Sequence, residues 1–281
     1  RAADAEAMRQ MEMDYSDGYL CEKQLRRKDG QLIFVNVDTR CVRAQNRSIS
    51  FIITVVEDIS QRKASEQQLK HQKNLYEMLS QTNQAIVHCQ DRNELFKQIC
   101  QIAVEHGGLL LAFIGKYYKE LNDIDVLHSF GDDHGFSSWV TEHKKLQPEL
   151  LTRTGAIQAL MSQQDLVFND YQNEPSTEPF HQIAHTSGIA SAGYFIIREK
   201  NEIAGVLSLY SDTVNFFDAE TQATINEMAL DVSFALDNLN REHKLLESEQ
   251  RFRAAIMNSP SPTVIYTESG TGLTLNRQIG R

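Results

Sequence analysis

Long apolar runs and an excess of basic residues are both missing from this chain of 281 residues. No run approaches the roughly 18 uninterrupted apolar residues that a membrane-spanning helix needs. The 28 Lys and Arg residues are outnumbered by 38 Asp and Glu residues, giving a net charge of −10 at pH 7. Binding to nucleic-acid phosphates would require basic residues gathered on one face. We therefore expect a cytoplasmic protein that neither inserts into a membrane nor binds nucleic acid.

Cysteine is scarce as well. The four cysteines fall at no spacing typical of a zinc site or a redox pair, and their sparse use fits a reducing compartment and small buried side chains; they are Cys21, Cys41, Cys89 and Cys100. The sequence also lacks a Gly-rich phosphate loop, the common hydrolase motifs, a kinase phosphoacceptor histidine, and cyclase or phosphodiesterase signatures. We predict no metal site and no catalytic residue in this chain, and the sequence indicates no particular cofactor.

The start of the chain, Arg1-Ala2-Ala3-Asp4, lacks both an initiating Met and the apolar core of a signal peptide. We therefore expect it to begin inside a longer protein. Two charged helical runs, residues 58–69 and 241–252, lie about 180 residues apart and frame one block of about 160 residues. A module placed between two helical connectors is the layout expected of a protein that transmits a conformational change from one domain to another.

Period-two alternation predicts three antiparallel strands before the first connector, at residues 21–27, 32–43 and 49–56. Asp29-Gly30 supplies the positive φ angles that a tight hairpin between the first two strands requires. The second strand places its apolar residues on one face: Ile33, Val35, Val37 and Cys41. Three strands make a poor core, so we expect this sheet to lack its beginning.

Residues 26–63 combine a hairpin, two strands and an exit helix in a specific order. The segments are Arg26-Arg27-Lys28-Asp29-Gly30, the strands that follow, and Val56-Glu57-Asp58-Ile59-Ser60-Gln61-Arg62-Lys63. This order resembles the C-terminal half of a PAS domain, in which the Asp of an Asp-Ile-Ser/Thr motif ties the last strand to an outgoing signalling helix. The resemblance implies that Asp58 relays the signal, and Asp58 also suits a helix N-cap.

The central block alternates between helical and strand periodicity, which predicts an α+β fold with an antiparallel sheet and flanking helices. Gly131–Leu150 is polar and irregular and contains the single tryptophan, Trp139. The predicted elements are helical segments over 75–106, strands at 109–118 and 124–130, helices at 155–163 and 180–185, strands at 166–168, 192–198 and 203–210, and a helix from about Asp218.

Several segments of this block follow one another in a recognisable order: Gly155–Leu160, Val167–Asp170, Gly188–Ala192, Ile203–Tyr210, Phe217–Glu220 and Ala229–Leu239. They resemble a GAF domain of the bacterial signalling type over roughly residues 75–240. The last segment is similar to the closing helix of GAF modules that precede diguanylate cyclase, phosphodiesterase or histidine kinase outputs. The fold does not fix the ligand.

Ligand pockets of such modules lie between the sheet and the variable segments above it, so the resemblance implies a set of lining residues. The aromatic members could equally be core residues, and Asp170 could belong to a turn. Two histidines at i and i+4 could hold a metal only with a nearby third ligand. The candidates are Trp139, Phe168, Asp170, Tyr171, His181, His185, Ser191 and Tyr194.

Departures from better-known branches of the family narrow the ligand. Leu209-Tyr210-Ser211-Asp212 replaces the Asn-Lys motif of the cyclic-nucleotide branch, so that ligand is not expected. All four cysteines precede residue 101, whereas bilin attachment and methionine-sulfoxide reduction both use cysteines of the pocket region. A weak enzymatic alternative would pair His181 or His185 with Asp170.

Both connectors carry heptad-like seams. The first follows Arg62, Leu69, Tyr76 and Asn83 alternating with Ser65, Gln72, Leu79 and Ile86. The second is more apolar, and follows Ile225, Val232, Leu239, Leu246 and Arg253 alternating with Met228, Ala235, Glu242, Glu249 and Ile256. We predict a parallel homodimer in which Leu239 and Leu246 relay the signal. A solvated first helix, and packing of the second helix on its own sheet as far as Leu239, are the alternatives.

Residues 252–281 contain two short strand patterns around a Gly-containing turn, with Asn276 after the second. They resemble the start of another PAS domain. We thus expect five parts: a C-terminal PAS part (1–60), a helical linker (61–74), a GAF domain (75–239), a helical linker (240–251) and an N-terminal PAS part (252–281). The predicted function is sensing of a small molecule of unknown identity, relayed to an output domain outside the chain; the alternative is a ligand-free dimerisation spacer.

Overall fold

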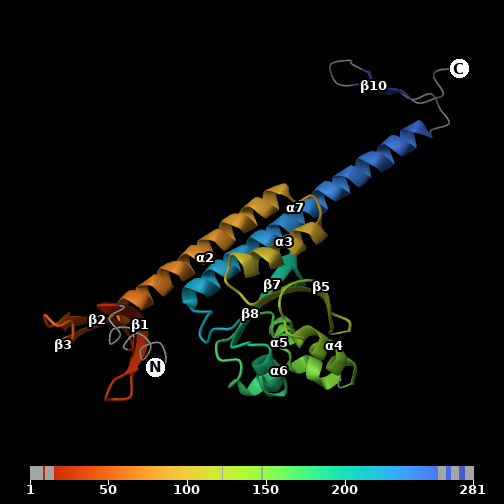
Figure 1. Cartoon of the computed structure of the whole chain (residues 1–281). Helices are drawn as coiled ribbons and strands as arrows, with labels where there is room; N and C mark the ends of the chain where they lie inside the picture. The colour runs from red at the N-terminus through yellow and green to blue at the C-terminus, as the bar shows by residue number, and fades with distance from the viewer. Residues whose placement is uncertain are drawn as a thin grey trace. The chain divides into compact units, whose positions relative to one another are not determined.

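The computed structural model describes residues 9, 16–121, 123–146, 148–258, 264–266 and 272–275 (Figure 1). The chain divides into two compact units, Arg1–Lys73 and Asn74–Arg281. Within the described ranges, no helix combines the length and the apolar composition that crossing a bilayer demands.

The first unit contains the three predicted strands as an antiparallel meander in the order β1-β2-β3. They are β1 (Gly18–Arg26), β2 (Leu32–Arg43) and β3 (Ile49–Asp58). Gly30 in the first hairpin has φ +90°, a conformation that favours glycine. The Asp29 carboxylate accepts a 2.9 Å hydrogen bond from the N–H of Gln31 and fixes the turn.

Only the middle strand of this meander is well buried. Val35, Val37 and Cys41 lie on its buried face, as predicted. The third strand, by contrast, has exposed side chains along its whole length apart from its first residue. Its apolar residues therefore have little contact with the described part of the first unit.

The second unit is built on a five-stranded antiparallel sheet in the order β5-β4-β8-β7-β6. Each strand lies within two residues of its predicted ends. The strands are β4 (Leu111–Tyr118), β5 (Asp123–Gly131), β6 (Leu166–Phe168), β7 (Ser191–Glu199) and β8 (Glu202–Ser211). The turn between β7 and β8 places Lys200 and Asn201 at φ 51° and 66°, as a two-residue hairpin requires.

Helices cover both faces of this sheet (Figure 1). One face packs against α2 (Ser60–His88), α3 (Arg92–Glu105) and α7 (Ala219–Met257), and the other against α4 (Phe136–Leu146), α5 (Gly155–Ser162) and α6 (His181–Thr186). Alternate residues of each strand enter the two layers: Ala112 and Ile114 contact the first, whereas Leu111 and Phe113 contact the second. The α+β prediction, with its antiparallel sheet and long helices, is confirmed.

Two of the long helices begin at aspartate caps, which satisfy N–H groups that lack intrahelical partners. Asp91 accepts hydrogen bonds from the N–H groups of Asn93 and Glu94 at 2.8 and 2.9 Å. Asp218 accepts one from Thr221 at 2.8 Å, which confirms the predicted start of the last helix.

The prediction of an irregular segment over residues 131–150 was wrong. This stretch forms α4 and the beginning of a 3-10 helix, η1 (Pro148–Arg153). Phe136, Trp139 and Val140 recur at helical spacing and face the second core layer. The Asp133 carboxylate accepts hydrogen bonds from the N–H groups of Gly135 and Ser137 at the entry to the helix. The polar residues between these apolar positions concealed the helical period.

A second 3-10 helix, η2 (Pro175–Phe180), precedes α6. At the C-terminal end, β9 (Val264–Tyr266) pairs antiparallel with β10 (Gly272–Leu275). Asn276 and the remainder of the segment that resembles a PAS start lie outside the described residues.

Candidate functional site

A cavity of about 340 Å³ lies between the centre of the five-stranded sheet and the helices α4 and α5. A volume of this size lies at the small end of the range for ligand sites. Most of its lining is aromatic or aliphatic. The lining residues are Phe113, Gly115, Ile124, Asp125, Val126, Phe136, Ser137, Val140, Thr141, Thr154, Gly155, Ala156, Ile157, Tyr171, Phe180, Tyr194, Val206, Ser208 and Tyr210.

The sheet provides the floor of the cavity through residues that alternate along neighbouring strands. On β8 these are Val206, Ser208 and Tyr210. Across the ladder, Phe113 of β4 lies opposite Ser208 and Gly115 lies opposite Val206. Because side chains two positions apart point to the same face of a strand, a period of two places all five beneath α4 and α5.

Three buried tyrosines form a connected group at this site. The Tyr194 hydroxyl lies 3.5 Å from that of Tyr210, and Tyr171 belongs to the same buried cluster. Burial raises the pKa of Tyr210 to about 12 and also raises the pKa values of Tyr171 and Tyr194. The three hydroxyls are thus neutral hydrogen-bonding groups at physiological pH.

The first turn of α5 forms one wall. The Thr154 side chain accepts a 3.4 Å hydrogen bond from the N–H of Ile157 and caps the helix. A methyl group added at Gly155 would overlap the ring of Tyr194. The absence of a side chain at Gly155 therefore lets the helix approach the tyrosine group closely.

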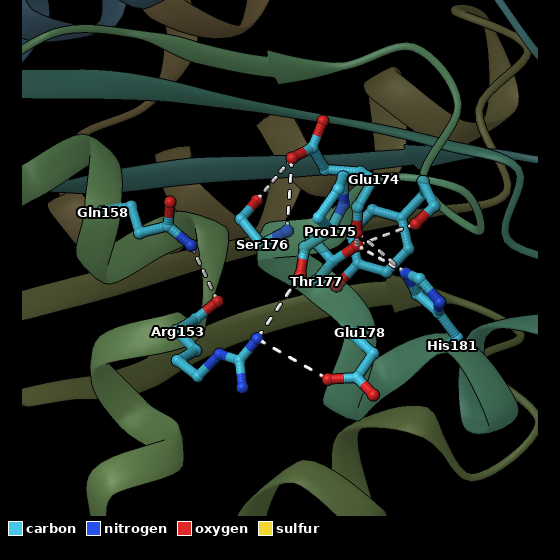
Figure 2. Close-up of polar contacts among 9 residues, drawn as sticks. Arg153, Gln158, Glu174, Pro175, Ser176, Thr177, Glu178 and His181 are labelled. Atoms are coloured by element: carbon cyan, nitrogen blue, oxygen red, sulfur yellow. Dashed lines mark hydrogen bonds and ion pairs between the residues drawn. The ribbon is translucent and has the colours of Figure 1, made fainter.

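A polar network holds the segment that carries Tyr171 and Phe180 against this wall (Figure 2). The buried Thr177 hydroxyl donates a 2.7 Å hydrogen bond to the carbonyl of Tyr171. The Glu174 carboxylate accepts hydrogen bonds from the N–H and the hydroxyl of Ser176 at 3.2 and 2.9 Å, capping η2. These bonds fix the backbone from which two lining side chains project.

The same network reaches the 3-10 helix η1 through Arg153 (Figure 2). The Arg153 guanidinium donates to the carbonyl of Pro175 at 3.4 Å and lies 3.9 Å from the Glu178 carboxylate. Gln158 on α5 donates to the carbonyl of Arg153 at 2.9 Å. Segments distant in sequence are thereby joined at one rim of the cavity.

The two histidines that the sequence placed at metal-binding spacing have different surroundings. Nε2 of His181 lies 3.0 Å from the carbonyl oxygen of Glu174 and 3.1 Å from the Thr177 hydroxyl, whereas His185 is exposed. A ring nitrogen that donates to a carbonyl cannot also bind a metal. In the described part of the chain, no group of three His, Cys, Asp or Glu residues could hold a metal ion.

Of the eight predicted ligand residues, Tyr171 and Tyr194 line the cavity and the others do not. Phe168 packs edge-on against both tyrosines from behind, with ring centroids about 6 Å away. Trp139 stacks on His143 at 3.8 Å. These aromatics support the lining and remain outside it.

The polar candidates have structural partners elsewhere. The buried Ser191 hydroxyl donates a 2.8 Å hydrogen bond to the carbonyl of Thr213. Asp170 is exposed and accepts from the Asn173 amide at 2.9 and 3.0 Å, as in the turn that the sequence left open. Neither Asp170 nor Ser191 reaches the cavity, so the pairing of Asp170 with a histidine has no geometric basis there.

Sequence reasoning missed most of the lining, including Phe136, Thr154, Ser208, Tyr210 and Asp125. The signal for Ser208 and Tyr210 was available, because they share a face with Val206 in the predicted strand. The signal for Phe136 depended on recognising α4.

The three residues predicted to relay a signal have distinct surroundings. Asp58 ends β3, where its carboxylate accepts a hydrogen bond from the N–H of Ser60 at 3.0 Å and pairs with Arg27 at 2.5 Å. The bond from Ser60 is the first cause of its lowered pKa. Leu239 packs against the core layer that contains α7, whereas Leu246 is 57% exposed on the same helix.

Side chains of α7 also bind the end of the β7–β8 hairpin. The Ser233 hydroxyl accepts a 3.0 Å hydrogen bond from the N–H of Arg198, and the Asn240 amide donates to the Glu199 carboxylate. Glu199 pairs in addition with Arg92 at the start of α3, at 2.5 Å. The hairpin whose strands carry Tyr194 and Tyr210 is therefore attached to two helices of the opposite layer.

A family model described as a GAF domain matches residues 89–237, just over half of the chain. The search of curated proteins finds no match to this chain. The matched range contains the whole five-stranded sheet and every residue that lines the cavity.

Several solved structures are similar to this chain. The free methionine-R-sulfoxide reductase of Neisseria meningitidis, in complex with its substrate, is 14% identical with a TM-score of 0.47, over 60% of this chain and 91% of that chain. The GAF domain region of a protein from Geobacter sulfurreducens PCA is 19% identical with a TM-score of 0.41, over 57% and 97%. The phytochrome photosensory core module of Stigmatella aurantiaca is 15% identical with a TM-score of 0.44, over 82% and 48%.

Proposed function

The chain belongs to the GAF domain family, and on that premise we propose that it is a sensory module that binds a small molecule in its cavity and relays the change through dimeric helices. The observation that carries the proposal is the apolar cavity of about 340 Å³ between the sheet and α5. Its lining aromatic rings and its few polar groups are the features expected of a small-molecule site. The output domain lies outside the chain in this proposal.

A route from the cavity to α7 follows the β7–β8 hairpin. Tyr194 and Tyr210 line the cavity from the two strands of that hairpin. The far end of the hairpin is hydrogen-bonded to Ser233, Asp237 and Asn240 of α7. We propose that the hairpin and α7 adopt two arrangements in equilibrium. A ligand that binds one arrangement more tightly shifts this equilibrium toward it, to an extent set by the difference in affinity.

We further propose that α7 pairs with its copy in a second subunit. Four large apolar side chains recur along it at intervals of 4, 11 and 7 residues, and each interval returns to the same side of an α-helix. They are Leu230 (68% exposed), Phe234 (62%), Leu245 (72%) and Phe252 (61%). We refer to these four residues as the α7 stripe. Such a row of exposed large side chains favours a helix–helix interface.

The α7 stripe differs from the seam predicted from the sequence. The first half of that seam, including Ile225, Met228 and Val232, is buried against the sheet, which was the alternative left open for it. Leu239 then serves to hold α7 on the sheet, and Leu246 projects from α7 beyond it. We propose that Leu239 couples the sheet to the helix and that the helix carries the change onward through Leu246.

The segment around Asp58 is consistent with a second signal that enters the GAF domain from the N-terminal side. We propose that residues 1–60 are the C-terminal part of a PAS domain, and that α2 carries its signal into the GAF domain through the linker 61–74. Lys63 and Arg62 near the start of α2 pair with Glu22 of β1 at 2.5 and 2.6 Å. Leu69 and Tyr76 of the first seam are exposed along α2, as pairing of two α2 helices would require.

We extend the proposal to the C-terminal part and to the output. Residues 240–251 would act as a second linker and residues 252–281 as the start of a second PAS domain, ahead of a cyclase, phosphodiesterase or histidine kinase output. We propose that the chain itself performs no catalysis and works in the cytoplasm. The buried Cys100 supports the absence of thiol chemistry, because burial raises its pKa to about 12 and it belongs to the core layer on the other face of the sheet.

Native mass spectrometry of the full chain tests the proposal. We expect a dimer in which each subunit carries an additional small mass that is released at higher collision energy. A dimer with no bound mass, from several expression hosts, would favour the ligand-free dimerisation spacer. A monomer would contradict the relay.

A further inference from the structure

Ser208, on the central strand of the cavity floor, is a buried polar residue whose hydroxyl has no hydrogen-bond partner among the described residues. It is 5% exposed and lines the cavity. By contrast, the buried Ser191 hydroxyl of the same sheet donates to the carbonyl of Thr213 at 2.8 Å. Thr82 and Ser187 also lack partners, but they lie outside the lining. Since buried polar groups in proteins nearly always have partners, the Ser208 hydroxyl is available to a ligand in the cavity.

Three aromatic side chains enclose Ser208. Phe113 of β4 and Tyr194 of β7 lie directly opposite it in the two ladders, and Tyr210 is the next residue on the same face of β8. The Tyr210 ring packs against the rings of Phe113 and Tyr194 with centroids 5.7 and 5.9 Å apart. A small polar side chain among these large rings leaves space for a flat apolar group that also reaches the hydroxyl.

The volume of the cavity suits two fused aromatic rings or one substituted ring. It is about 340 Å³, whereas an apolar cavity of about 150 Å³ is enough to hold benzene. Phe136, Ile157 and Phe180 extend the apolar lining on the helical side. An aromatic ligand would therefore bury its faces against apolar and aromatic side chains.

The described lining presents no charged side chain to the cavity. Asp125 is its single residue of a charged type, but it lies between Ile124 and Val126, which both line the cavity, and opposite Lys116 in the β4–β5 ladder. Because successive side chains of a strand alternate between the faces of the sheet, the Asp125 carboxylate points to the other face. An ionised ligand would thus lose its hydration without meeting an opposite charge among the described residues. The first turn of α5 favours an acceptor atom, which an uncharged oxygen also provides.

We infer that the cavity takes an uncharged aromatic compound of one or two rings, whose single hydroxyl or N–H group hydrogen-bonds to Ser208. The Ser208 hydroxyl can donate as well as accept, so it suits a phenol, an aromatic alcohol or an aromatic N-heterocycle. This inference rests on the proposed sensory function, and it names the ligand class and a specificity-determining residue of the same site.

Equilibrium dialysis of the full chain at neutral pH with three probes of one ring system tests the inference: 2-naphthol, 2-methylnaphthalene and 2-naphthoate. We expect 2-naphthol to bind at least about fivefold more tightly than 2-methylnaphthalene, the factor that one hydrogen bond provides. The ionised 2-naphthoate should bind at least about fivefold more weakly than 2-naphthol. Ser208→Ala should reduce the preference for 2-naphthol over 2-methylnaphthalene to within about twofold. Ser162→Ala, at an exposed position of α5 outside the lining, should leave it unchanged.

The stability of Ser208→Ala provides a second, independent readout. Because the substitution removes no hydrogen bond to a described residue, the urea midpoint should equal or exceed that of the parent protein. A clearly lower midpoint would show that the hydroxyl is bonded within the protein, and would overturn its assignment to the ligand.

Each other outcome of the dialysis also overturns the inference. Equal binding of 2-naphthol and 2-methylnaphthalene would show that the ligand needs no polar group, and tightest binding of 2-naphthoate would show that the cavity favours an anion. Both leave the sensory proposal intact, because a ligand is still bound. A preference that persists in Ser208→Ala would place the polar contact elsewhere, and a preference lost in Ser162→Ala would be unrelated to the cavity. If no probe binds, the aromatic class is wrong, and the bound mass sought by native mass spectrometry decides the sensory proposal separately.

Discussion

The backbone N–H of Lys200, in the turn between β7 and β8, donates a 2.7 Å hydrogen bond to the Asp237 carboxylate of α7. Asp237 lies four residues after Ser233, which binds the same hairpin. Residues four apart lie on one side of a helix, so a single face of α7 holds the hairpin at two points. The hairpin in turn supplies Tyr194 and Tyr210 to the cavity.

Removing the Asp237 carboxylate should loosen this attachment. We expect Asp237→Ala to lower the free energy of unfolding by about 1 kcal/mol, the usual contribution of one hydrogen bond that is partly open to solvent. Asp237→Asn keeps an acceptor oxygen and should lose less. Urea denaturation of both variants measures the difference, and equal losses would show that the hydrogen bond to Lys200 contributes nothing specific.

The close approach of Gly155 to Tyr194 predicts that replacing Gly155 by alanine lowers the stability of the domain, whereas helix propensity alone would predict an increase. Ala is a better helix former than Gly by about 1 kcal/mol, yet a methyl group at Gly155 would overlap the tyrosine ring. We expect Gly155→Ala to destabilise the domain by about 1–3 kcal/mol. Met161→Ala, at an exposed position of the same helix, serves as the control and should change the unfolding midpoint little. A stabilised Gly155→Ala protein would contradict the close packing at this wall.

Alkaline pH should destabilise the domain. Burial raises the pKa of the Cys100 thiol from 9.0 to about 12 and that of Tyr210 from 10.0 to about 12. The unfolded chain therefore loses these protons first, so their contribution is complete below pH 9 and is lost as the pH rises toward 12. Urea midpoints between pH 8 and 11 should fall less steeply in Cys100→Ala than in the parent protein. Parallel pH profiles would refute the assignment to the thiol.

Most helices and strands could be predicted from the sequence, because strand alternation and helical periodicity are visible in short stretches of residues. The strands β7 and β8, the α7 cap at Asp218 and the hairpin at Gly30 all carry such signals. The helix α4 did not, because its apolar face is narrow and is interrupted by serine, threonine and histidine.

The cavity was less predictable because it depends on which residues of separate elements meet. Tyr171 and Tyr194 could be named as aromatic residues near the right segments, but the sequence does not show that Trp139 turns toward His143.

Dimerisation through the α7 stripe can be distinguished experimentally from dimerisation through the heptad seam predicted from the sequence. A buried charge opposes helix pairing, so we expect Leu245→Glu to raise the dimer dissociation constant by about tenfold or more, measured by sedimentation equilibrium. Phe252→Glu should do the same. Gln250→Glu adds the same charge to the opposite side of α7 and should leave the dimer intact.

Leu246→Glu distinguishes the two faces, since Leu246 belongs to the predicted seam and Leu245 to the stripe. Both side chains are exposed, by 57% and 72%, so neither substitution should unfold the domain, and circular dichroism of each variant verifies this. Dissociation by Leu246→Glu alone would restore the predicted seam and reject the stripe. If neither charge dissociates the dimer, pairing through this part of α7 is wrong, and the two subunits must associate through another surface.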